Sequence, residues 1–314
     1  MPGTNIFTPA LCRGISQHEL YQSFAMPDYC GSFFHEAPMN GAYYDIQTWQ
    51  GMGPASEHRR GETVTMDGAV PSFGYRIYAR TFTTGTAIYD EDQEDDLYNI
   101  IHRLFPRLGG QWAQSFYQLK QILGAQFFGL YGFQAGTSVP YSPDGVSLIS
   151  NAHPISKSNS NTWSNSAGNV DFSLAAFQLA NALMFKTPSP NGIPMGLKIH
   201  RVMVHSDKDN VARQIVYQKE WEYGNADHNT NKYLTKGVNV EVVANPFLTY
   251  SGASGTNNKW IAQADDHQCM WMPRSGLKIK TMEVPDVLAT KIIASKRYGY
   301  GVYDPRGMAG GGGL

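Results

Sequence analysis

The amino-acid sequence predicts an α+β fold in which one long helix packs on a β-sheet. Apolar residues recur at helical spacing from Leu97 to Tyr131, which predicts the helix. Residues between Trp49 and Tyr89 alternate between apolar and polar, and more strand patterns follow residue 199, which together predict the sheet. A helix with a broad aromatic stripe needs a sheet or other helices to cover it. The 314 residues suffice for one large domain or two smaller ones that share a core.

Composition argues against several classes of protein. The chain has 25 basic and 26 acidic residues, so no basic excess marks it as a dedicated nucleic-acid binder. No apolar run approaches the roughly 18 residues of a membrane span, and no basic and apolar leader opens the chain, so we expect it to begin its life in the cytoplasm. The cysteines Cys12, Cys30 and Cys269 are odd in number and form no C-x-x-C pair. We expect buried thiols rather than a disulfide framework or a zinc site.

Residues 1–47 form the first segment, an arm without a sustained period. It contains the aromatic pairs Phe33-Phe34 and Tyr43-Tyr44 in turn-forming surroundings. This composition is too aromatic for a disordered chain, yet it has too little pattern to build its own core. We expect the arm to lie across another surface, such as a second copy of the chain.

Residues from Trp49 to Tyr89 predict a β-hairpin. Residues 62–66 alternate, Asp67-Gly68 is a hairpin turn signal, and the alternation resumes from Phe73 to Ala79. An isolated hairpin is marginally stable in water. This one must therefore pack on the body of the protein or on a neighbour.

The long helix begins after an acidic run at residues 90–96. Carboxylates suit the positive end of a helix macrodipole. Pro106 and the pair Gly109-Gly110 predict a kink or a short break. The second part, from Gln111 to Leu130, would span about 30 Å at 1.5 Å per residue.

The remaining chain alternates loops, helices and strands. Residues 141–169 predict a loop-rich region whose Ser/Asn-rich part is a mobile surface loop. Ser173 should cap a helix that ends before Pro188, and Ser206 should cap a second helix that runs to about Tyr217. Strands are expected at residues 199–205, 238–244, 260–265, 269–272, 277–283 and 292–303, and a flexible glycine-rich tail at 307–314.

Several of these stretches resemble one known family. The segment from Asp144 to His153 is similar to a D-G-x-x-L-F-x-x-x-H motif, with Ile149 where Phe is usual. Together with Asp95-Asp96-Leu97-Tyr98, the Leu174 helix, residues 243–248 and the ending at 298–306, it resembles the major capsid proteins of tailed bacteriophages. These proteins have the Hong Kong 97-like fold, and the Mu-like major head subunits are the most similar. The likeness runs in order from about residue 48 to 306. It departs at His205-Ser206, where the family has Pro-Pro.

The resemblance implies an architecture for the whole chain. Residues 1–47 would be an N-terminal arm and 48–88 an extended loop. Residues 89–171 would form a peripheral domain with the spine helix, and 172–275 an axial domain. Residues 276–314 would return strands to the peripheral domain and end in the flexible tail.

The resemblance also implies a function: self-assembly of hexamers and pentamers into an icosahedral shell that encloses double-stranded phage DNA. The subunit would belong to the virion, assembled in the host cytoplasm, with no membrane contact and only weak contact with DNA. The chain has no long helical scaffolding segment, so a separate scaffolding protein is implied, beside a portal and a decoration protein. An encapsulin-like compartment shell is an alternative within the same fold.

Catalytic and metal-binding roles have weaker support in the residues. Asp144, His153 and nearby serines could form a hydrolase triad, although no G-x-S-x-G accompanies them. His205 and Asp207 could bind a metal, but a helix-capping role suits them better. The acidic run lacks the glycine and final Glu of a calcium loop. We therefore predict no catalytic, cofactor or metal site.

Contacts between subunits are the predicted functional surface. The aromatic candidates in the arm and hairpin are Phe33, Phe34, Trp49, Phe73 and Tyr75. The charged candidates are Arg59 and Arg60 of one subunit, which would meet Asp95 and Asp96 of another. The alternative for the charged residues is two unrelated solvated clusters.

Overall fold

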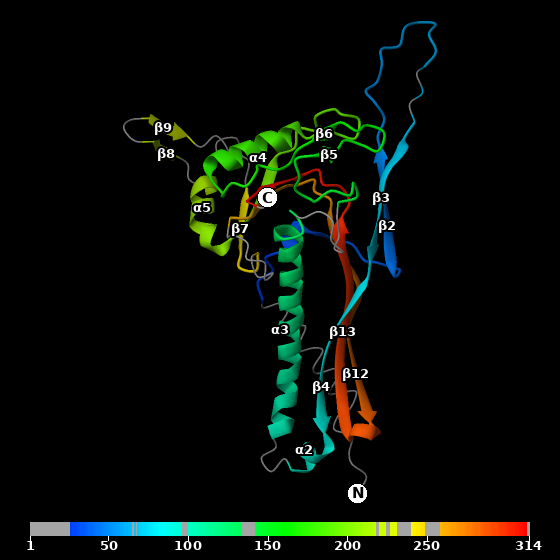
Figure 1. The fold of residues 1–314 in the computed structure, drawn as a ribbon, viewed down its shortest axis with the longest axis vertical. Coiled ribbons are helices and arrows are strands. Elements are labelled where there is room, and N and C mark those ends of the chain that lie inside the picture. Colours follow the sequence, from blue (N-terminus) through cyan, green and yellow to red (C-terminus); the bar gives the residue numbers. More distant parts are fainter. Residues whose placement is uncertain are drawn as a thin grey trace.

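The computed structural model describes residues 26–64, 66, 68–95, 100–133, 142–217, 220–223, 227–230, 240–248 and 258–312. Figure 1 shows that they form an elongated part in which a long helix lies beside long strands, a compact part above it, and a projecting pair of strands. Among these residues, no helix combines the length and apolarity needed to cross a membrane.

The long helix, α3 (Ile100–Gly129), is continuous over 30 residues. The short break predicted as one alternative at Pro106 and Gly109-Gly110 was therefore wrong. Side chains beyond these residues explain the continuity, since Trp112 and Phe116 pack on the sheet, and such tertiary contacts outweigh local propensity. Within the acidic run, Asp90–Glu94 form a short helix of their own, α2, with Asp95 as its C-cap; Asp96 lies outside the described residues.

α3 covers a four-stranded sheet in the order β1 (His35–Glu36), β12 (Cys269–Val284), β13 (Ala289–Val302) and β4 (Arg80–Tyr89). The predicted packing of the helix on a sheet is confirmed, because Trp112 and Phe116 contact Ile292 and Ala294. The strands predicted at 269–272 and 277–283 are one strand, whose register shifts between Pro273 and Lys278.

The projecting arm consists of β2 (Tyr43–Gln50) and β3 (Val70–Tyr78), which pair antiparallel. The hairpin was predicted, but with the wrong first strand: the described residues of 62–66 are irregular. Burial explains the choice, since Ile46 and Ile77 enter one apolar cluster with Met39 and Met272. The predicted boundary between 47 and 48 therefore falls inside β2.

The compact part contains a second four-stranded sheet, ordered β10 (Glu241–Asn245), β7 (Ile199–His205), β11 (Trp260–Ala264) and β14 (Met308–Gly311). β14 corrects the prediction of a flexible tail at 307–314. Its glycines are needed because a Cβ at Gly310 would lie 2.7 Å from the Trp260 carbonyl oxygen, and one at Gly311 would lie 3.0 Å from the Trp260 ring. The glycine-rich end thus contains the buried strand β14, while residues 313–314 lie outside the described residues.

Two helices accompany this sheet. Ser173 caps α4 (Leu174–Lys186), as predicted, because its side chain accepts a hydrogen bond from the Ala176 amide. The 3₁₀ helix η2 (Ser206–Lys208) leads into α5 (Asp209–Tyr217). The cap of η2 lies one residue before the predicted Ser206: the His205 ring accepts from the Asp207 amide at 3.2 Å.

Short elements complete the fold: η1 (Gly31–Phe33), β5 (His153–Pro154), β6 (Thr162–Trp163), β8 (Glu220–Tyr223), β9 (Asp227–Thr230) and η3 (Pro285–Val287). The Ser/Asn-rich run around β6 is not the mobile surface loop that was predicted. Ser156, Asn165 and Ser166 in this run are buried. The run is held against β14 by hydrogen bonds of Asn165 and Ala167 with Gly310.

The prediction that Phe33 and Phe34, in the N-terminal segment 1–47, contact a neighbouring subunit also needs a correction. Both are buried in the core of their own chain, where Phe33 contacts the ring of Phe128 edge-on and Phe34 packs against Phe127 and Trp271. These contacts satisfy the two aromatic side chains within the subunit, so they are not available to a neighbour.

Candidate assembly surfaces and their buried support

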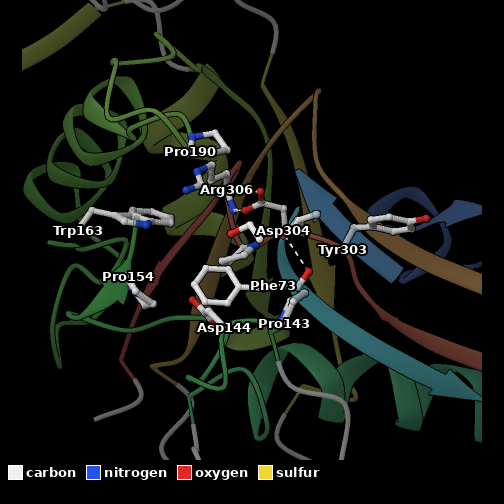
Figure 2. Close-up of a pocket in the computed structure, with 12 residues that line it drawn as sticks. Phe73, Pro143, Asp144, Pro154, Trp163, Pro190, Tyr303, Asp304 and Arg306 are labelled. Atoms are coloured by element: carbon white, nitrogen blue, oxygen red, sulfur yellow. Dashed lines mark hydrogen bonds and ion pairs between the residues drawn. The ribbon is translucent and has the colours of Figure 1, made fainter. Parts of the chain in front are cut away.

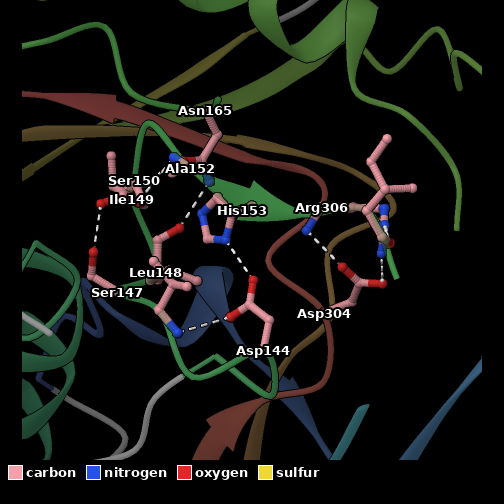
Figure 3. A network of polar contacts seen from close by, with 12 residues as sticks. Asp144, Ser147, Leu148, Ile149, Ser150, Ala152, His153, Asn165, Asp304 and Arg306 are labelled. Carbon is pink, nitrogen blue, oxygen red and sulfur yellow. Dashed lines mark hydrogen bonds and ion pairs between the residues drawn. The ribbon is translucent and has the colours of Figure 1, made fainter. Parts of the chain in front are cut away.

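A buried carboxylate and imidazole order the segment that follows α3 (Figure 3). Asp144 Oδ2 lies 2.7 Å from His153 Nδ1, and Asp144 Oδ1 accepts a hydrogen bond from the Val146 amide at 3.2 Å. The Trp163 ring stacks on His153 with centroids 4.8 Å apart. The side chains of Asp144 and His153 are 3% and 0% exposed. The Asp144 carboxylate therefore fixes the turn and the ring together.

Asn165 connects this segment to the second sheet through both its side chain and its backbone. Its amide nitrogen donates to the Leu148 carbonyl at 2.8 Å, and its oxygen accepts from the Ser150 amide at 2.8 Å. The Asn165 backbone carbonyl accepts from the Gly310 amide of β14 at 3.1 Å. Asn165 thus satisfies buried backbone groups that no regular strand reaches.

Arg306 joins three segments that are distant in sequence. Its guanidinium donates to the carbonyls of Pro188 and Ile155, each at 2.6 Å, and to the Asp304 carboxylate at 2.7 Å. It also lies over the Trp163 ring, 5.8 Å from the centroid. The planar fork of arginine suits such divergent acceptors. The chain just after α4, the β5 segment and the end of the chain are thereby held together.

A pocket lies beside Arg306, at the base of the projecting arm (Figure 2). Its walls come from β2 and β3, from the segment around Asp144 and Trp163, and from the chain end. The lining residues are Thr48, Ser72, Phe73, Pro143, Asp144, Pro154, Trp163, Pro190, Tyr303, Asp304, Pro305 and Arg306. Phe73 lines this pocket within its own chain, together with Asp144, Trp163 and Arg306, so β3 is anchored against these segments.

The hydrolase alternative depended on a serine near His153. His153 Nε2 is buried and has no hydrogen-bond partner in the described part of the chain. The Ser147 hydroxyl donates instead to the Ile149 carbonyl at 2.9 Å, and the Ser150 hydroxyl accepts from the Ala152 amide. The contacts of Asp144 and His153 thus hold the loop in place, and neither Ser147 nor Ser150 is hydrogen-bonded to His153 as a nucleophilic serine would be.

The contacts of His205 and Asp207 are those of a helix cap rather than of a metal site. His205 Nδ1 lies 3.2 Å from an Asp207 carboxylate oxygen and accepts from the Asp207 amide, as expected for a helix cap. Within the described residues, no group of three or more His, Cys, Asp or Glu side chains is placed to hold a metal ion.

The beginning of the described chain is fastened to α3 by polar contacts. Asp28 accepts hydrogen bonds from Lys120 and Gln121, both at 2.7 Å. Burial alone would raise the pKa of Asp28, but these two partners outweigh it and lower the pKa below its ordinary value. Burial raises the pKa of the Cys30 thiol to about 12, which keeps it neutral and unreactive. The thiols of Cys30 and Cys269 are free and buried, as predicted; Cys12 lies outside the described residues.

The Tyr-Gly alternation near the end of β13 provides the surface on which the projecting arm packs. Tyr298 and Tyr300 point toward α3 and stack on Trp271. Gly299 and Gly301 point the other way, where β3 packs directly on the backbone. The sequence predicted this alternation as a strand, but it could not predict that Ile77 of β3 packs against the two glycines.

The structure separates the predicted contact residues into two groups. Side chains exposed to solvent are Trp49, Arg59, Arg60 and Asp95. Side chains that pack within their own chain are Phe33, Phe34, Phe73 and Tyr75. Asp96 lies outside the described residues. Sequence reasoning missed the sheet face opposite α3, where Lys278, Lys280 and Lys291 are gathered, because these lysines become neighbours only through strand pairing.

Comparison with solved structures decides the fold. A structure from Mycobacterium phage Bobi matches with a TM-score of 0.52 and 10% identity, covering 91% of this chain and 90% of the other. The capsid of an empty GTA particle also matches with a TM-score of 0.52 and 10% identity, covering 91% of this chain and 90% of the other. The chain has the fold of a phage capsid subunit. A structure from Mycobacterium phage Ogopogo also matches, with a TM-score of 0.50, 12% identity, and 92% and 97% coverage.

The capsid fold is thus present at very low sequence identity. No protein-family model matches the sequence, and neither does any curated protein. The match extends over nearly the full length of both chains, so the capsid fold here includes both sheets and the long helix.

Proposed function

We propose that this chain is the major capsid protein of a tailed phage, which self-assembles into an icosahedral shell around double-stranded DNA. The observation that carries the proposal is the capsid fold over about nine-tenths of the chain, shared with the capsid of the GTA particle. The elongated shape and the projecting arm of Figure 1 suit a subunit that tiles a surface.

The projecting arm is the first surface proposed to bind a neighbouring subunit. Residues 51–64, between β2 and β3, are exposed, and they follow Trp49, whose side chain is 56% exposed. Met52 and Val64 are also exposed. At about 25 cal/mol per Å², an interface of roughly 800 Å² per partner can hold such a loop on a neighbour. Arg59 and Arg60 on the loop would then meet the neighbour's Asp95 and Asp96.

The remaining partners follow from the same function. Hexamers and pentamers would form the shell, with a separate scaffolding protein, a portal and a decoration protein. The mature protein would reside in the virion after assembly in the host cytoplasm. Since the charges nearly balance, contacts with packaged DNA should be weak and salt-sensitive.

The test is the size and content of the particles that the full chain forms. We expect closed shells by size-exclusion chromatography and electron microscopy, formed with a scaffolding protein from the same genome. A chain that stays monomeric under these conditions would contradict the proposal. Shells that enclose a protein cargo instead of DNA would favour the encapsulin-like alternative.

A further inference from the structure

We propose that the acidic helix α2 of one copy of this chain binds the basic face of the long sheet in a neighbouring copy. The inference rests on the proposed function and names a contact between its subunits. The two charged surfaces lie at the same end of the molecule, on opposite sides, and do not pair with each other.

The basic surface is the face of β12, β13 and β4 that points away from α3. Strand pairing places three rows of residues on this face: Lys278–Ser295–Thr83, Lys280–Ile293–Gly85 and Met282–Lys291–Ala87. Directly paired residues of antiparallel strands point to one side. Because the alternate residues Ile279, Ile292 and Ala294 pack with α3, the three lysines must point away from it.

The charges of this face are unbalanced. None of the residues in the three rows is acidic. Within the described part of the chain, no ion pair involves Lys278, Lys280 or Lys291. On the same hairpin, Glu283 belongs to the alternate set that faces α3, and Asp286 lies in the η3 turn. The three ammonium groups are thus free to bind an acidic partner.

The acidic surface is α2, which follows β4 directly. The carboxylates of Asp90, Glu91, Asp92 and Glu94 are exposed, and none of them forms an ion pair in the described chain. The Asp90 amide donates to the Leu288 carbonyl at 2.9 Å, which fixes the start of α2 at the end of the sheet. Figure 1 shows α2 between the lower ends of β4 and α3. The acidic helix therefore lies on the α3 side of the sheet.

Opposite charges on opposite sides of one end cannot meet within a chain, but they can meet between copies. Such a contact joins two different surfaces, and it closes a ring when the rotation between successive copies brings the last copy back to the first. Met282 and Ile293 lie among the lysines and are 54% and 36% exposed. These apolar side chains favour a protein partner over the phosphates of DNA, which bind cations and polar groups.

The experiment is a charge reversal in the full chain, scored by the yield of shells. Lys278→Glu with Lys280→Glu should lower the yield about tenfold, and so should Glu91→Lys with Asp92→Lys. The four changes together should restore the yield to within about twofold of the parent, since the contact is then rebuilt with reversed signs. Raising salt from about 0.15 to about 1 M, where the Debye length falls from about 8 to about 3 Å, should weaken assembly of the parent more than of the lysine variant.

The outcomes separate this contact from a net-charge effect, a contact of the projecting loop and a role in DNA binding. Reversal of Lys157 and Lys186, exposed elsewhere, changes the net charge equally and should leave assembly intact; an equal loss there would overturn the local contact. Rescue of the α2 variant by Arg59→Glu with Arg60→Glu, rather than by the lysine reversals, would assign α2 to the projecting loop and overturn the inference. So would a lysine variant that assembles normally but no longer binds duplex DNA. If the parent chain forms no shells, the proposed function fails first.

Discussion

Ile77 of β3 packs against the bare backbone of Gly301 in β13. A Cβ added at Gly301 would lie 2.5 Å from Ile77 Cδ1. The projecting arm therefore rests on the sheet at the one kind of residue that leaves room for it, and the hydrophobic cluster of Met39, Ile46 and Met272 surrounds the contact.

Gly301→Ala should destabilise the subunit by about 1–3 kcal/mol, the usual cost of overpacking a core. Chemical denaturation of the unassembled subunit measures this loss. Ile77→Val removes Cδ1 and should restore part of it in the double variant. Gly276→Ala is the matched control, because nothing lies within 4 Å of its added Cβ. Equal stability of the Gly301 variant and the parent would contradict the packing described.

Arg306→Lys should cost about 2–3 kcal/mol of stability despite keeping the charge. A lysine cannot donate to the carbonyls of Pro188 and Ile155 and to Asp304 in the fixed directions of a guanidinium, and a buried carbonyl would lose its partner. Thermal unfolding measures the change. Arg213→Lys is the control: its pair with Asp209 is exposed, so a loss below about 0.5 kcal/mol is expected.

Phe33→Ala should destabilise even the unassembled subunit, by about 3–5 kcal/mol, because the ring is buried in the chain's own core. Urea denaturation at a concentration where no shells form gives the measurement. If Phe33 served only a neighbour, the variant would be as stable as the parent until assembly. For the same reason, deletion of residues 1–40 should unfold the subunit rather than leave it folded but unable to assemble.

The elements that the sequence predicted well are those with local signals. Ser173 predicts the start of its helix because a hydroxyl at the N-cap accepts a hydrogen bond from an amide three residues further on. The apolar run from Ile199 to His205 is typical of a buried strand. The candidate capsid fold was also predictable, because it depended on the order of many weak motifs rather than on any single one.

The elements that were mispredicted depend on distant partners. A glycine-rich end reads as flexible until Trp260 is known to lie against Gly310 and Gly311. The alternation at 62–66 is as regular as that of β2, and only the cluster around Ile77 decides which segment pairs. The basic face of the sheet could not be predicted for the same reason: its lysines are brought together by strand register.

Acid should weaken the subunit through His267. Burial, together with nearby His35 and Arg201, lowers the pKa of His267 to about 4, from an ordinary value of 6.5. The folded state therefore keeps the ring neutral, while the unfolded chain takes up a proton below pH 6.5. The stability that His267 contributes is complete above that pH and is lost as pH falls toward 4. A stacked neighbour, His35, lies 4.0 Å away between ring centroids and would oppose the new charge.

Denaturation at pH 7 and pH 5 tests this, with an expected loss of up to about 2 kcal/mol, since each unit of pKa shift is 1.36 kcal/mol. His267→Gln should flatten this dependence, whereas His58→Gln, on the exposed loop, should leave it unchanged. A His267 variant with the same pH dependence as the parent would contradict the assignment.

The last prediction concerns Arg59 and Arg60 on the projecting loop. We expect Arg59→Glu with Arg60→Glu to impair assembly, and the addition of Asp95→Arg with Asp96→Arg to restore part of it. Each exposed pair contributes only about 0.2–1 kcal/mol. A closed shell repeats the contact in every subunit, however, so a small free energy can fix the direction in which the loop docks. The yield of shells is the measurement, at low and at high salt, because exposed pairs are screened as the Debye length falls below about 8 Å. If the variant with only the arginines reversed assembles as well as the parent, both clusters are solvated surface.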